Sequence, residues 1–138
     1  MKKYGLIIFV LCFTLAIFAG NFARAQQPPP PDKPPASVAG KWTLYCNDPN
    51  GSSSSKFLDL RQNGDVISGR FKGPNQSGGV EGTIKNQHLV VRTKTRGVLI
   101  FRGRVDGPRV DGVVQGNAFN GTFHDRGGTG SFQGVRSN

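Results

Sequence analysis

The chain has 138 residues, among them 20 glycines, 9 prolines and 2 cysteines, and a formal net charge of +10. This length accommodates one domain, and so much glycine beside a single Met and a single Glu argues against a helical bundle. Two cysteines are too few for a disulfide-stapled miniprotein or a cysteine-rich zinc module. We therefore expect a small, basic, all-β protein.

Residues 1–25 have the features of a secretory signal peptide. A lysine-rich start precedes an uncharged stretch, residues 5–19, and Ala23 and Ala25 occupy the cleavage positions. The alternative is an uncleaved membrane anchor, but about 15 apolar residues at about 1.5 Å each are shorter than the roughly 30 Å hydrocarbon core. We predict cleavage after Ala25, export to the periplasm or the cell exterior, and no transmembrane span in the mature chain.

Residues 26–37 form a proline-rich segment, QQPPPPDKPPAS. Proline favours an extended conformation and cannot donate to a β-ladder, so this segment is predicted to be a linker, with recognition of its PxxP motif as the alternative. The folded domain is then residues 38–138. Its only thiol is Cys46, which is buried, paired with another chain or reactive. We predict burial, because Cys46 continues the alternation of Trp42 and Leu44.

The domain repeats a short motif of Gly, any residue and a large apolar residue. Its last four copies begin nine residues apart, at Gly103, Gly112, Gly121 and Gly130. One short strand plus one tight turn fits this spacing, which predicts a single antiparallel up-and-down meander β-barrel of about eight strands. The candidate strands are 40–46, 56–62, 65–72, 79–85, 88–95, 98–105, 109–115, 118–124 and 129–136. We interpret these nine candidates as eight barrel strands and one irregular segment.

Turn residues set the expected registers of the first hairpins. An Asn63-Gly64 turn places Leu60 opposite Ile67. A turn at 86–87 places Ile84 opposite Leu89 and Glu81 opposite Arg92 on the outer face. A three-residue loop at 95–97, with Gly97 left-handed, keeps the apolar residues Leu89, Val91, Leu99 and Phe101 on one face.

The same scheme applied to the later strands uses a loop at 106–109. It pairs Phe101 with Val114 and places Arg104 beside Asp111. A final turn at 125–128 brings Gly121 beside Phe132. Glycine permits sharp coiling and close backbone approach, so inward glycines among Phe and Val indicate a small closed barrel. The glycines expected on the inner face are Gly69, Gly82, Gly103, Gly112, Gly121, Gly130 and Gly134.

The two ends of the domain resemble the calycin-type barrels, the avidins and lipocalins. Gly40-Lys41-Trp42 matches their G-x-W opening, and Arg136 on the last strand matches the basic residue that packs over the indole. Residues 64–69 resemble the next hairpin of an avidin, and G-x-W also opens a family of secreted bacterial protease inhibitors. The resemblance implies a barrel closed by Trp42 and Arg136. It does not extend to biotin, because avidins use several tryptophans and this chain has one.

No arrangement of residues indicates catalysis. The two histidines, His88 and His124, lack a third nearby ligand and make a poor metal site, and no acidic pair suggests glycoside hydrolysis. We therefore expect a non-enzymatic protein without a cofactor. The first hypothesis is a small apolar or amphipathic ligand bound in the barrel interior or its mouth. The residues expected to bind it are Trp42, Phe71, Phe101, Phe119 and Phe123.

The alternative hypothesis is an interaction protein or inhibitor that acts through its exterior. The basic side chains Arg92, Lys94, Arg102 and Arg104 are expected to share the outer face of one hairpin, where they would attract an anionic envelope polymer or another exported protein. Nucleic acid is not expected, because no exposed aromatic platform accompanies them. An open interior favours the first hypothesis, and a packed interior favours the second.

Overall fold

The computed structural model describes residues 33–137. The predicted signal peptide and the linker up to residue 32 lie outside this range. The described chain forms one compact unit that begins at Lys33. Within it, no helix has the length and apolar character needed to span a membrane.

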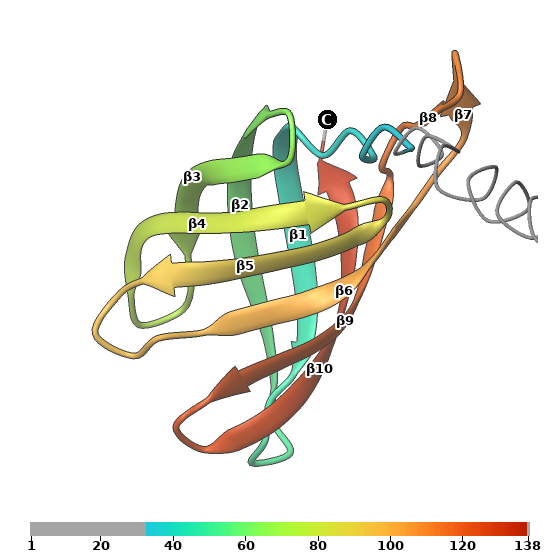
Figure 1. Cartoon of the computed structure of the whole chain (residues 1–138). Coiled ribbons are helices and arrows are strands. Elements are labelled where there is room, and N and C mark those ends of the chain that lie inside the picture. Colours follow the sequence, from blue (N-terminus) through green and yellow to red (C-terminus); the bar gives the residue numbers. More distant parts are fainter. Residues whose placement is uncertain (1–32, 138) are drawn as a thin grey trace, which may run out of the picture. The chain divides into compact units, whose positions relative to one another are not determined.

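Eight strands close into one antiparallel barrel, in the spatial order β1-β10-β9-β6-β5-β4-β3-β2 (Figure 1). They are β1 (Gly40–Asn47), β2 (Ser53–Asn63), β3 (Val66–Lys72), β4 (Ser77–Lys85), β5 (His88–Lys94), β6 (Ile100–Asp106), β9 (Ala118–Asp125) and β10 (Gly128–Ser137). Pairing of β1 with both β2 and β10 leaves neither terminal strand with a free edge. The predicted all-β meander barrel is confirmed.

Alternation of apolar and polar residues along each strand sends one set of side chains into the barrel. In β1, Trp42, Leu44 and Cys46 point inward and are buried, whereas Tyr45 points outward. The interior also receives aliphatic residues from β2 to β6. These are Leu58, Leu60, Ile67, Val80, Ile84, Leu89, Val91 and Val105.

The expected irregular segment is the chain between β6 and β9. It forms a small separate hairpin, β7 (Arg109–Val110) and β8 (Val113–Val114), which projects from one end of the barrel in Figure 1. Asp111 and Gly112 have φ of 51° and 80°, so they form the left-handed two-residue turn that an Asp-Gly pair favours. The nine-residue spacing of the glycines predicts a continuous strand here, in conflict with this turn signal.

Because of this hairpin, β6 pairs directly with β9. The predicted pairing of Phe101 with Val114 is therefore wrong, and Phe101 lies opposite Phe123. Arg104 is bonded to Asp106 in its own strand and not to Asp111.

The other registers differ in small ways. Asn63 pairs with Val66, so the turn is one residue later than predicted. Leu60 therefore lies opposite Gly69, but the same residues face the interior. The predicted pairings across 86–87 and across 95–97, and that of Gly121 with Phe132, are confirmed. Gly97 is not left-handed as predicted. Its backbone N–H and C=O are both bonded to the side-chain amide of Gln76.

Close strand approach explains the inward glycines. A Cβ on Gly121 would overlap the carbonyl oxygen of Arg102, and one on Gly82 would overlap that of Val90. Gly112 is the exception to the prediction: it lies in the β7–β8 turn, with no atom near its would-be Cβ. Strong coiling of the sheet thus depends on glycine in the barrel strands and not in the projecting hairpin.

Candidate functional site

The five side chains predicted to bind a ligand lie together inside the barrel, but they are buried against one another. Trp42 meets Phe119 edge to face with ring centres 6.3 Å apart, and Phe101 lies 5.5 Å from Phe123 and 6.1 Å from Phe71. Phe132 completes the cluster, 4.7 Å from Phe119. These rings fill the middle of the barrel and form its core.

One end of the barrel is covered by the segment that leads into β1. Ala36 and Val38 are buried there, and Gln62 holds the segment by accepting from the Val38 N–H and donating to the Ala36 carbonyl. The indole N–H of Trp42 donates to the Val38 carbonyl at 2.9 Å. This end is therefore closed by backbone and side-chain hydrogen bonds.

Arg136 completes that closure. Its guanidinium carbon lies 4.9 Å from the Trp42 ring centre. The guanidinium donates to the carbonyls of Gly116, Ser37 and Ala39. Gly40, at φ 131°, leaves room for the guanidinium, which a Cβ at that position would obstruct. Burial lowers the pKa of Arg136, but its pKa starts so high that the side chain stays charged.

The opposite end is open and contains a pocket of about 420 Å³. Four loops meet there, those that follow β1, β3, β5 and β9. Phe71 and Leu99 supply apolar lining, and Asn50, Asn75 and Gln76 supply amides. This mixture of apolar floor and polar rim is typical of a small-molecule site.

Lys56 is the most unusual residue of this pocket. It points into the barrel, its side chain is only 8% exposed, and its ammonium lies 4.8 Å from the centre of the Phe123 ring. It donates to Asp48 at 2.9 Å and to Ser54 at 2.5 Å. Lys56 is not among the predicted site residues, although it alternates in phase with the buried Leu58 and Leu60, which indicates that it faces inward.

Asp48, in the loop after β1, is the counter-charge of Lys56. Burial alone would raise the pKa of this carboxyl, but hydrogen bonds from Lys56, Ser54 and Ser52, with the Lys56 charge, lower it overall. Cys46 is buried, as predicted, and burial raises the pKa of its thiol despite the nearby Lys56. The pocket thus contains a largely buried ion pair.

The basic residues of the alternative hypothesis lie on the outer faces of β5 and β6. Lys94 pairs with Glu81 at 3.1 Å, and Arg104 pairs with Asp106 at 2.9 Å. Glu81 lies opposite Arg92, as predicted, but its carboxylate bonds to Lys94. Within the described chain, Arg92 and Arg102 have no salt-bridge partner.

His88 and His124 are exposed and lie on separate strands, β5 and β9. Among the residues that the structure describes, no three His, Cys, Asp or Glu side chains gather as metal ligands. No protein-family model matches the chain, and no curated protein matches it.

Proposed function

We propose that this chain is an exported, non-enzymatic, calycin-like binding protein that holds a small amphipathic ligand at the open end of its barrel. The observation that carries this proposal is the contrast between the two ends. One end is closed by Trp42, Arg136 and the segment before β1, whereas the other has a pocket of about 420 Å³. The calycin-like part rests on the G-x-W opening and on the packing of Arg136 over Trp42.

The pocket lining suggests the class of ligand. The apolar part of the ligand would lie on Phe71 and Leu99, and its polar part among the amides and the Lys56–Asp48 pair. Because Asp48 already neutralises Lys56, the polar part does not have to carry a charge. The packed aromatic core argues against a ligand in the interior and counts in favour of the exterior alternative. The proposed ligand would therefore lie in the mouth of the barrel.

Dye binding tests this proposal. The fluorescent amphiphile 1-anilinonaphthalene-8-sulfonate should bind the folded protein and be displaced by octyl glucoside or dodecanoate. Asn75→Trp, which places a large ring in the pocket rim, should abolish the signal, whereas Asn63→Trp, at the end of β2 on the closed side of the barrel, should not. A folded protein that binds no dye, or equal binding by both variants, would overturn the proposal.

A second candidate function is binding of an anionic envelope polymer through the basic outer face. It is favoured by Arg92 and Arg102, which lie on neighbouring strands without acidic partners in the described chain. Retention on heparin should fall when Arg92, Lys94, Arg102 and Arg104 are all changed to Ser. Unchanged retention would exclude this face as the binding site.

A further inference from the structure

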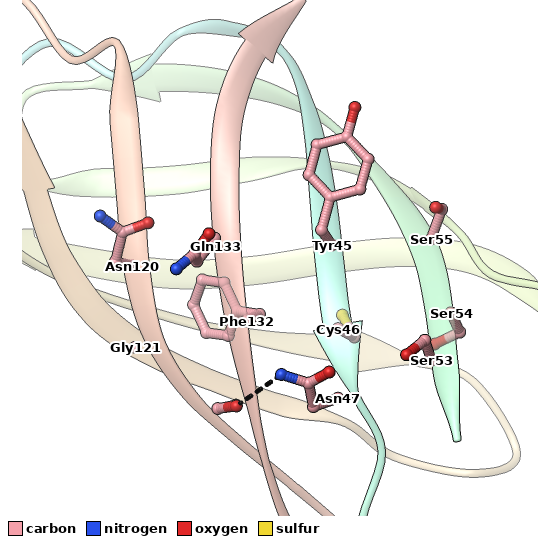
Figure 2. Close-up of a pocket in the computed structure, with 11 residues that line it drawn as sticks. Tyr45, Cys46, Asn47, Ser53, Ser54, Ser55, Asn120, Gly121, Phe132 and Gln133 are labelled. Atoms are coloured by element: carbon pink, nitrogen blue, oxygen red, sulfur yellow. Dashed lines mark hydrogen bonds between the residues drawn. The ribbon is translucent and has the colours of Figure 1, made fainter. Parts of the chain in front are cut away.

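A second pocket lies on the outside of the barrel, across β9, β10, β1 and β2 (Figure 2). It has a volume of about 670 Å³ and shares only Ser54 with the pocket at the open end. Tyr45, Asn47, Asn120 and Gln133 line it with exposed, outward-pointing side chains. In Figure 2, Tyr45 on β1 lies between Gln133 on β10 and Ser55 on β2. We call this pocket the outer groove.

The outer groove belongs to an uncharged part of a strongly basic protein. Three consecutive rows of outward-facing residues cross these four strands without one charged side chain. The rows are Ala118, Val135, Thr43 and Phe57; Asn120, Gln133, Tyr45 and Ser55; and Thr122, Ser131, Asn47 and Ser53. The next strands, β6 and β5, carry the basic face. The barrel exterior is therefore divided into a charged and a neutral part.

The side chains of the outer groove suit a ligand rich in hydroxyl groups. An amide offers both donors and an acceptor, as a sugar hydroxyl also does, so Asn and Gln can match hydroxyls in either direction. Within the described chain, Asn47 donates weakly to Ser131 at 3.4 Å, and the Asn120 and Gln133 amides make no side-chain hydrogen bond. Their hydrogen-bonding capacity is available to a ligand.

Tyr45 adds an aromatic ring, the second feature typical of sugar-binding sites. Tyr45 is 56% exposed. The other aromatic residue that lines the groove, Phe132, is buried, so Tyr45 supplies its exposed aromatic ring. An aromatic ring provides a flat apolar surface for the C–H face of a pyranose, and its hydroxyl provides a further polar contact. The groove therefore offers an apolar ring flanked by polar amides and serines. This arrangement matches a sugar, which has apolar C–H faces bordered by hydroxyl groups.

We propose that the outer groove binds an uncharged sugar chain. An anionic polymer is disfavoured, because the groove has no cation, while the basic face beside it has several. A protein partner is disfavoured as well, because protein interfaces have apolar, aromatic-rich centres from which serine is depleted, and serines line much of this groove. The sugar chain would cross β1 and β10, outside the barrel and away from the open-end pocket.

Sedimentation with insoluble neutral polysaccharides tests this proposal. The intact protein should be retained by at least one of cellulose, chitin or curdlan particles, in about 0.5 M NaCl, which screens its charge. Heparin-agarose serves as the anionic comparator, and binding there should fall with salt. Asn75→Trp, which blocks the open-end pocket, should leave polysaccharide binding unchanged, so failure of this proposal is distinguishable from failure of the proposed function.

Variants of exposed residues locate the binding site without threatening the core. Tyr45→Ala should weaken retention roughly tenfold, Tyr45→Phe should retain most of it, and Asn120→Ala with Gln133→Ala should weaken it further. Phe57→Ala is the matched control, because Phe57 is an exposed aromatic residue of the same outer face that does not line the groove. No retention on any neutral polysaccharide, or equal effects of Tyr45→Ala and Phe57→Ala, would overturn the proposal.

Discussion

The guanidinium of Arg136 stacks 4.9 Å from the ring centre of Trp42, at the seam where β10 pairs with β1. The two residues are partners in the ladder that closes the barrel. Arg136 also donates to carbonyls of the segment before β1, so one side chain joins the last strand, the first strand and the covering segment. A planar guanidinium with several donors suits this position better than an ammonium.

Removal of this guanidinium should destabilise the barrel strongly. Arg136→Ala loses the contact with Trp42 and three hydrogen bonds to carbonyls, of which that of Ser37 keeps the Gly116 N–H as a donor. We expect a loss of roughly 2–3 kcal/mol in the free energy of unfolding. Arg136→Lys should lie between. Urea unfolding can be followed by the fluorescence of Trp42, the only Trp in the chain. Arg61→Ala, at an exposed arginine, is the control; an equal effect would show that the closure contributes nothing.

Substitution of an inward glycine should be still more damaging. A Cβ on Gly121 would overlap backbone atoms of Arg102 and Gly103, which cannot move without opening the β6–β9 ladder. We expect Gly121→Ala to cost roughly 3 kcal/mol or more. Gly79→Ala is the matched control, because the nearest atom to its Cβ would be 3.7 Å away, in ordinary contact. Thermal melts of both variants give the comparison, and similar melting temperatures would contradict this account.

Alternation and turn chemistry made most of the fold predictable. Leu60, Ile67 and Phe71 face inward as predicted, although the turn comes one residue later. Moving the turn by one residue shifts the pairing by two, so every side chain stays on the same face. The error at 107–117 has a different cause. There the regular nine-residue spacing predicts a barrel strand, whereas the local Asp111-Gly112 pair predicts a tight turn. Only the tertiary pairing of β6 with β9 decides between the two.

The candidate sites were harder to predict than the fold. The aromatic residues were placed inside correctly, but sequence does not reveal whether inward rings leave a cavity or fill it. The role of Lys56 was not predicted, because its counter-charge Asp48 lies in the preceding loop and no sequence pattern pairs the two residues. The outer groove is lined by β9 and β10 together with β1 and β2, which are far apart in the chain. No local sequence pattern therefore predicts it.

Cys46 should behave as a protected thiol. It is buried, and burial raises the pKa of its thiol, so both access and the thiolate fraction are low at neutral pH. In a Cys12→Ser background, its reaction with a chromogenic disulfide reagent should be slower than that of an exposed Ser55→Cys thiol by on the order of a hundredfold or more. Urea should abolish the difference. Equal rates in the folded protein would show that the reagent reaches Cys46 without unfolding and would contradict this prediction.

The Lys56–Asp48 pair should make stability depend on acid pH. The folded protein lowers the pKa of Asp48, so this carboxyl stabilises the fold above its ordinary titration range, about pH 4, and that contribution is lost as pH falls through the lower folded value. The difference in unfolding free energy between the native chain and Asp48→Asn should therefore be largest near pH 7 and vanish in strong acid. Urea unfolding from pH 7 down to pH 2 measures it.

The relative burial of the two charges predicts which single variant costs more. The Lys56 side chain is 8% exposed and that of Asp48 is 18%, so removing Asp48 leaves the more buried charge uncompensated. At pH 7 we expect Asp48→Asn to cost roughly 1–3 kcal/mol and Lys56→Met to cost less, because methionine fills a similar volume. The double variant should be more stable than Asp48→Asn alone. Strict additivity of the two single effects would show that the ion pair contributes no coupling and that burial of Lys56 is tolerated without Asp48.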